Sequence, residues 1–212
     1  MHNIQKQELY TRFMKQYNTF SRLHSFMMYD GSIETMAEKF KYSEGMHQPD
    51  FEPILRYLKA TIKCDRDNGL NCNRYKAYEY LTGGQNGLNI IRGSGHVIYG
   101  LPDGADFNFV NIYHCEGGNN PDRLCFWAIN FAVDTNGIEK GPNALGRDLF
   151  EFIFYPNKKE IMLGHEAYAT STSRVEELQE DKILEYCDST KKDEKQGDTC
   201  GLRLLFEKKM DY

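Results

Sequence analysis

Polar residues gather between residues 134 and 148 of this 212-residue chain, directly after an apolar run that predicts a buried strand. Asp134, Asn136, Asn143 and Asp148 carry carboxylate and amide oxygens, and three glycines between them allow backbone carbonyls to turn inward. Calcium binds roughly six to eight oxygens of this kind in a flexible geometry. The residue types therefore predict a calcium site, although the spacing is not that of an EF-hand loop.

The same residues also have an interpretation that involves no metal. Asp and Asn at strand ends accept hydrogen bonds from their own backbone turns, and the Asn136-Gly137 pair is typical of a tight turn. Arg147 could neutralise Asp148 or Asp134 directly. Because turn chemistry alone explains the residue types, a hydrogen-bonded turn is the simpler of the two interpretations, and the sequence leaves both open.

Six cysteines fall into three pairs that are close in sequence. Each pair brackets a short polar segment that can close locally, which favours disulfides and an oxidising compartment over free thiols in the cytosol. A zinc site is the other alternative, but the C-x2-C spacing of such sites is absent. The disulfides that we expect are Cys64–Cys72, Cys115–Cys125 and Cys187–Cys200.

Other catalytic and binding patterns are absent from the sequence. Ser94 lies between two glycines, but Gly93-Ser94-Gly95-His96 is not a nucleophile elbow and is typical of a hairpin turn. The six histidines are dispersed, and no glycine-rich phosphate-binding motif is present. A net charge of -5 and a pI near 5.7 give no electrostatic basis for binding nucleic acid. We therefore predict neither an enzyme nor a nucleic-acid-binding protein.

The chain begins with a helical pattern over residues 3–29, because apolar residues such as Phe13, Tyr17 and Phe20 recur every three or four positions. Glycine follows its last turn at position 31. We expect three parts within one globular domain: the N-terminal helix at residues 1–31, a helical and loop insertion at residues 32–87, and an antiparallel sheet with a disulfide-tied C-terminal loop at residues 88–212.

Alternation of apolar and polar residues predicts the strands of that sheet, and it places Phe150, Phe152 and Phe154 on one face. The expected strands are residues 88–91, 96–101, 106–115, 126–133, 149–154, 160–163 and 201–206. Helical spacing predicts further helices at residues 32–40, 53–62, 75–81 and 175–184. The predicted fold class is α+β, with a long N-terminal helix packed on an antiparallel sheet and helical insertions before it.

The spacing of turn and strand residues resembles that of a known family. The pattern V-D-x-N-G, G-P-N, G-x-D-x-F-x-F is similar to the globular domain of type IV pilins and type II secretion pseudopilins. A D-G-x-x-F step and the ending M-D-Y are similar too. The matching residues are Asp103, Gly104, Phe107, Asp134, Asn136, Gly137, Gly141, Pro142, Asn143, Gly146, Arg147, Asp148, Phe150, Phe152, Met210, Asp211 and Tyr212.

The resemblance implies a structural subunit of an extracellular or periplasmic filament that serves adhesion, motility, DNA uptake or protein secretion. Its partners would be other copies or related pilins, joined through an apolar N-terminal half-helix, and an inner-membrane assembly machinery. The subunit would be membrane-anchored before assembly and would then lie at the cell surface. The Cys187–Cys200 position fits the disulfide that ties the C-terminal loop in pilins, and some pseudopilins bind calcium in a loop comparable to residues 134–148.

The chain contains no stretch of ~18–20 apolar residues and opens with no signal peptide. We therefore expect it to start after the apolar half-helix, with Met1 supplied for expression. The competing interpretation is a secreted ligand-binding module or hydrolase with a disulfide-stabilised sheet. A cleft lined by tyrosines and Trp127 would favour that alternative.

Overall fold

The computed structural model describes residues 3–32, 51–65, 68–70, 78–82, 97–115, 125–154, 161–163, 180–191 and 196–212. The predicted strand at 88–91 lies outside these residues, and so does the predicted helix at 32–40 except for its first residue. The helices are α1 (Asn3–Tyr29), α3 (Glu52–Leu58), α5 (Glu180–Glu185) and α6 (Cys200–Glu207). The strands are β1 (Thr61–Asp65), β2 (Val97–Gly100), β3 (Asp106–Cys115), β4 (Cys125–Asp134), β5 (Leu149–Phe154) and β6 (Met162–Leu163).

Within the described residues, six strands form one antiparallel sheet in the order β1-β2-β3-β4-β5-β6. Each strand therefore pairs with its neighbour in sequence. The longest pairing joins β3 and β4 along their whole length, from Asp106 opposite Asp134 to Cys115 opposite Cys125. The α+β class, the antiparallel sheet and the N-terminal helix are thus confirmed.

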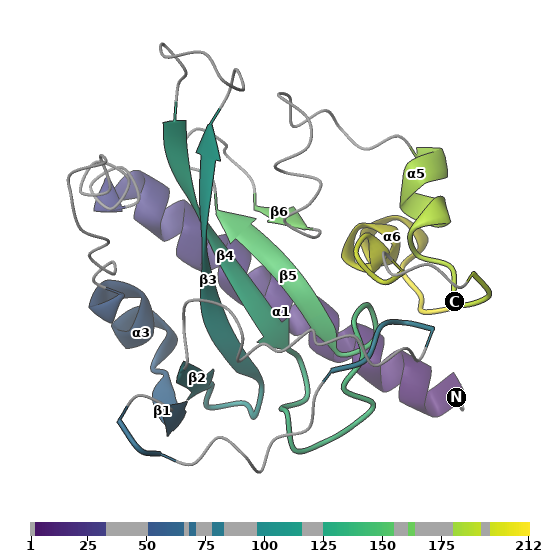
Figure 1. The fold of residues 1–212 in the computed structure, drawn as a ribbon, viewed down its shortest axis with the longest axis horizontal. Coiled ribbons are helices and arrows are strands. Elements are labelled where there is room, and N and C mark those ends of the chain that lie inside the picture. The colour runs from purple at the N-terminus through teal and green to yellow at the C-terminus, as the bar shows by residue number, and fades with distance from the viewer. Residues whose placement is uncertain are drawn as a thin grey trace.

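Helix α1 lies diagonally across one face of the sheet (Figure 1). Its buried side chains recur at helical spacing from Leu9 to Met27, and the predicted phenylalanine face of β5 meets them. At the centre, the Phe20 ring lies 5.0 Å from Phe131 and 5.2 Å from Phe152, measured between ring centroids. Aromatic packing between α1 and β4–β5 therefore forms the main core.

The opposite face of the sheet carries a smaller apolar cluster. Side chains one position out of phase with the main core, such as Ile98 on β2 and Ala132 on β4, pack there with Leu145 and Leu149. Tyr78 joins them from a segment that pairs with the loop after β4, through a parallel bridge between Glu79 and Ala144. The loop between β4 and β5 therefore covers this face.

Three local predictions are wrong. The expected strand at 201–206 is helix α6, because leucine, arginine and glutamate favour a helix and Arg203 pairs with Glu207 at 2.9 Å, one helical turn away. The helix predicted to reach Ile62 ends at Leu58, since Lys59 adopts a left-handed φ of 52°, and β1 follows. Of the helical turn predicted at 75–81, the structure describes residues 78–81, and these contain the bridge between Glu79 and Ala144 instead of a helix.

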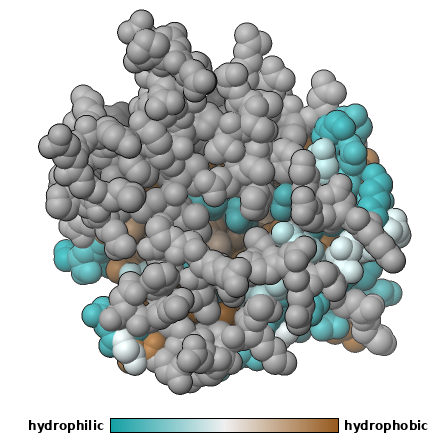
Figure 2. Space-filling view, in the orientation of Figure 1, coloured by the Kyte–Doolittle hydropathy of each residue, from teal (hydrophilic) through white to brown (hydrophobic). Residues whose placement is uncertain are grey.

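Helices α5 and α6 lie together at one side of the sheet (Figure 1), and hydrophilic side chains gather over α5 (Figure 2). The predicted helix at 175–184 overlaps α5, which spans Glu180–Glu185. Helix α6 reaches the main core through Leu204. Across the described ranges, no helix combines the length and apolar character needed to span a membrane.

Candidate functional site: the 134–148 loop

Asp134 ends β4 and organises the first turn of the loop. Its Oδ1 accepts hydrogen bonds from the backbone N–H groups of Asn136 at 3.0 Å and Gly137 at 2.8 Å. Its Oδ2 accepts a hydrogen bond from the hydroxyl of Tyr78. Gly137 has a φ of 89°, and a Cβ there would lie 2.5 Å from the carbonyl oxygen of Gly104, so this turn requires glycine.

Asp148 organises the other end of the loop in the same way. Its Oδ2 accepts a hydrogen bond from the backbone N–H of Asn143, and its Oδ1 accepts one from that of Ala144, each at 2.7 Å. All four oxygens of the two predicted carboxylate ligands therefore already accept hydrogen bonds from the chain.

The two predicted asparagines point into the same loop. The amide nitrogen of Asn136 donates to the carbonyl oxygen of Gly141 at 3.1 Å, and that of Asn143 donates to the carbonyl oxygen of Ile138 at 3.0 Å. Their amide oxygens are buried and lack a hydrogen-bond partner. The loop therefore contains two unpaired amide oxygens, and they lie between two carboxylates that accept hydrogen bonds from backbone turns.

Burial governs the charge of this cluster. It raises the pKa of both aspartates above the usual carboxyl range, and the charge of Asp148 raises the pKa of Asp134 further. Burial and the neighbouring Asp134 also raise the pKa of the Tyr78 hydroxyl, which therefore stays a hydrogen-bond donor. A protonated carboxyl binds a cation more weakly, so this environment disfavours a metal unless binding removes the proton.

The hydrogen bonds of Asp134 and Asp148 are those of the predicted hydrogen-bonded turn, while the unpaired oxygens of Asn136 and Asn143 are compatible with the predicted calcium site. Oxygen atoms from all four predicted residues lie in one loop, but among the described residues no group of three or more His, Cys, Asp or Glu side chains is positioned to hold a metal ion. Calcium binding by Asp134, Asn136, Asn143 and Asp148 stays a prediction, and the unpaired asparagine oxygens are its structural basis.

The predicted disulfide Cys187–Cys200 is present and buried next to this loop, with an S–S distance of 2.01 Å. A Cβ added at Gly146, whose φ is 79°, would lie 2.7 Å from the sulfur of Cys200. The hydroxyl of Tyr212 donates to the carbonyl oxygen of Gly146 at 2.7 Å. The glycine is therefore needed where the loop, the disulfide and the C-terminal segment meet.

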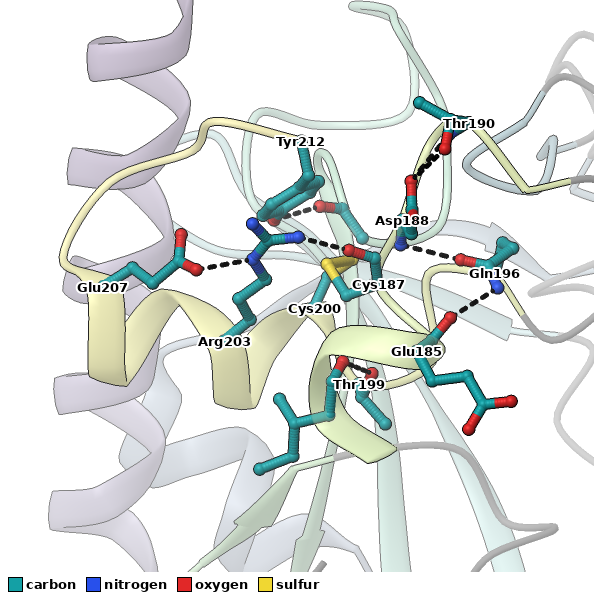
Figure 3. The surroundings of a disulfide bond; sticks show 12 residues. Glu185, Cys187, Asp188, Thr190, Gln196, Thr199, Cys200, Arg203, Glu207 and Tyr212 are labelled. Atoms are coloured by element: carbon teal, nitrogen blue, oxygen red, sulfur yellow. Dashed lines mark hydrogen bonds and ion pairs between the residues drawn. A yellow bond between two sulfur atoms is a disulfide. The ribbon is translucent and has the colours of Figure 1, made fainter. Parts of the chain in front are cut away.

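Arg203 holds the C-terminal segment against the disulfide (Figure 3). Its guanidinium donates to the carbonyl oxygen of Cys187 and to Glu207, and it lies 5.2 Å from the centre of the Tyr212 ring. Gln196 closes the other side of the disulfide loop, since it accepts from the backbone N–H of Asp188 and donates to the carbonyl oxygen of Glu185. These contacts fix α6 to the loop that precedes it.

The other two predicted disulfides are supported to different degrees. Cys64 is disulfide-bonded, while Cys72 lies outside the described residues. Cys115 and Cys125 are direct partners in the β3–β4 ladder. Opposite residues of an antiparallel pair have Cα atoms about 4.5–5.5 Å apart, which suits a disulfide. The pairings Cys64–Cys72 and Cys115–Cys125 stay predictions.

Two buried residues of the site did not emerge from the sequence analysis. Asp106 accepts a hydrogen bond from the backbone N–H of Ile138 at 3.0 Å, and its other oxygen contacts the ammonium group of Lys63. Pairing the two ten-residue strands end to end would have placed Asp106 opposite Asp134. Tyr78 had no comparable signal, because it is 56 residues from its partner Asp134.

No family model matches the chain, and neither a curated protein nor a solved structure does.

Proposed function

We propose that the chain is the globular domain of a structural subunit of an extracellular or periplasmic filament, of the type IV pilin or pseudopilin kind. The observation that carries this proposal is the arrangement of α1. Its buried side chains begin at Leu9 and fasten it to the sheet, whereas none of the residues from Asn3 to Glu8 is buried. A helix anchored at one end and exposed at the other is suited to linking a globular head to a filament.

Two further features support the same function. The disulfide and the contacts of Arg203 and Tyr212 fasten the C-terminal segment to the sheet, as expected for a subunit that must withstand an extracellular environment. The loop motif from Asp134 to Phe152, on which the resemblance rests, joins β4 to β5 through turns that its aspartates hold by hydrogen bonds.

The proposed subunit has a structural role and no catalytic one. It assembles with further copies or with related subunits. An inner-membrane assembly machinery takes it from its membrane-anchored state into the filament. The buried loop faces the protein's own backbone, so filament formation depends on the surface around α1 and not on the chemistry of that loop.

Immunogold electron microscopy tests the proposal. Antibodies raised against the purified chain should label filaments on cells that produce the protein, and cells lacking the gene should carry no label. Mass spectrometry of the protein from those filaments should find an apolar segment upstream of Asn3. Diffuse label in the medium, or a native chain preceded by nothing but a cleaved signal peptide, would exclude a filament subunit.

A further inference from the structure

A polar pocket of about 470 Å³ lies where the start of α1, the loop between Cys187 and Cys200, and the C-terminal segment meet. Its volume is within the range of roughly 300–1,000 Å³ that is typical of small-molecule sites. Figure 3 shows part of its wall, in which Arg203 and Tyr212 lie near Asp188 and its neighbours. The pocket is therefore large enough for a small ligand.

Three segments that are far apart in the sequence bring cations to this pocket. Lys6 comes from α1, Arg147 from the loop before β5, and Arg203 from α6. The pocket also contains two carboxylates, those of Asp188 and Asp211. With three cations against two carboxylates, its lining within the described residues has a positive net charge at pH 7.

Both carboxylates already have partners. Asp188 accepts hydrogen bonds from the backbone N–H of Thr190 at 2.9 Å and from its hydroxyl at 2.7 Å, and Asp211 pairs with Lys209 at 2.6 Å. These contacts lower the pKa of both carboxyl groups, and the charge of Arg203 contributes to the lowering in each case. A cationic ligand would have to compete with these partners.

Three hydrogen-bond donors of the pocket, in contrast, are unused. The ammonium group of Lys6 and the hydroxyl of Ser189 have no hydrogen-bond or ion-pair partner in the part of the chain that the structure describes. Arg203 donates from Nε to Glu207 and from Nη1 to the carbonyl oxygen of Cys187, which holds the guanidinium in place and leaves Nη2 without a hydrogen-bond partner there. None of these three donors belongs to the buried unpaired atoms of the described side chains, so all three are accessible to a ligand.

Accessible donors in a pocket of positive net charge favour a ligand that accepts hydrogen bonds and carries negative charge. We propose that the pocket binds a compact oxyanion, such as phosphate, sulfate or a small carboxylate, through Lys6, Ser189 and Nη2 of Arg203. Ammonium and guanidinium groups form their strongest hydrogen bonds with acceptors of this kind. Arg147 adds a further positive charge to the wall. Binding at this pocket does not depend on whether the chain forms a filament.

NMR and isothermal titration calorimetry test the proposal on the purified full chain at low ionic strength, with sodium phosphate, sodium sulfate and sodium succinate as probes. We expect saturable binding that shifts the guanidinium resonances of Arg203 and weakens as sodium chloride is added. Lys6→Gln removes one charge-assisted hydrogen bond, so it should weaken phosphate binding about tenfold. It should leave the melting temperature unchanged, because Lys6 loses no partner among the described residues. Ser189→Ala should weaken phosphate binding about threefold.

Two further variants separate a specific site from a general effect of charge. Lys208 is exposed directly after α6 and does not line the pocket, so Lys208→Gln removes the same charge without removing a donor of the site. It should change neither the phosphate affinity nor the melting temperature. Lys6→Arg keeps both the charge and the donors, so it should retain most of the affinity.

Glycerol 3-phosphate distinguishes the two sources of such a group. Tighter binding than that of inorganic phosphate would assign the pocket to a phosphate carried by a larger molecule, and equal binding would assign it to the free oxyanion. Three results would overturn the proposal. They are no saturable binding of any probe, resonance shifts confined to residues outside the pocket, and equal losses of affinity in Lys6→Gln and Lys208→Gln.

Discussion

The packing of α1 on the sheet makes a quantitative prediction at Phe20. This side chain is 0% exposed, and its ring lies within 6.4 Å of four other rings, those of Phe107, Phe131, Phe152 and Phe154. Phe20→Ala removes the transfer free energy of a fully buried aromatic ring and leaves a cavity among rings that cannot collapse. We expect the free energy of unfolding to fall by about 3–5 kcal/mol, a large fraction of the ~5–15 kcal/mol typical of a whole domain.

Urea denaturation followed by circular dichroism measures this loss, and thermal unfolding gives a second value. For a chain of this size, the melting temperature should fall by about 10 °C. Phe206→Ala is the matched control, because the same side chain is 66% exposed on α6 and its removal should cost less than about 0.5 kcal/mol. Equal effects of the two substitutions, or a loss below about 1 kcal/mol for Phe20→Ala, would refute the packing of α1 on the sheet.

Three further predictions concern the cysteines, the half-buried Asp103 and the loop. Peptide mapping under non-reducing conditions should find Cys64–Cys72, Cys115–Cys125 and Cys187–Cys200, and replacing the last pair with serines should cost about 3 kcal/mol; free thiols at all six positions would instead indicate the cytosol. Burial raises the pKa of the Asp103 carboxyl, but hydrogen bonds from Lys15 and Gln16 outweigh it and lower the pKa below the usual value. Its stabilising contribution is therefore present above about pH 4 and lost as the pH falls through the lowered pKa. Asp103→Asn should thus destabilise the chain more at pH 7 than at pH 2.5, as urea denaturation at both values will show. Calcium and a chelator should give the same melting temperature, because the carboxylate oxygens of Asp134 and Asp148 already accept hydrogen bonds from the chain; a rise with calcium would establish the metal site.

Periodic patterns predicted the parts of the fold that a single face of a helix or strand determines. The three- and four-residue spacing of Phe13, Phe20 and their neighbours predicted α1, and the alternation in residues 149–154 predicted β5 with the correct face buried. Each of these patterns arises because one face of the element is buried against a single neighbouring layer. The residues of the element itself are therefore enough to predict it.

The errors arose where the pattern was ambiguous. Residues 201–206 contain three leucines and a phenylalanine with few polar interruptions, so periodicity does not separate a strand from a buried helix. The helix is favoured by contacts from distant segments. Leu204 reaches the core, and Gly201 passes close to Leu163 and Phe13. None of these contacts can be recognised within residues 201–206 alone.

The sequence likewise predicted one part of the candidate site and left another part open. The sequence identified Asp134, Asn136, Asn143 and Asp148 as one group but did not distinguish ligands from turn acceptors, because both roles use the same oxygens. The hydrogen bonds that the two carboxylates accept from the backbone favour the turn, and calcium binding stays a prediction. A cation needs carboxylate charge, whereas the desolvation that raises the pKa of Asp134 and Asp148 favours neutral groups that bond to the backbone.

Packing explains why a motif of this composition is needed even without a ligand. At Gly146 the loop passes so close to Cys200 that no side chain fits, and at Gly137 it passes equally close to Gly104. Both glycines adopt a positive φ, a conformation that residues with a side chain rarely adopt. Asp134 accepts hydrogen bonds from the backbone N–H groups of Asn136 and Gly137, and Asp148 accepts them from those of Asn143 and Ala144. The glycines and the aspartates therefore meet one requirement, which is the close approach of this loop to Gly104 at one end and to Cys200 at the other.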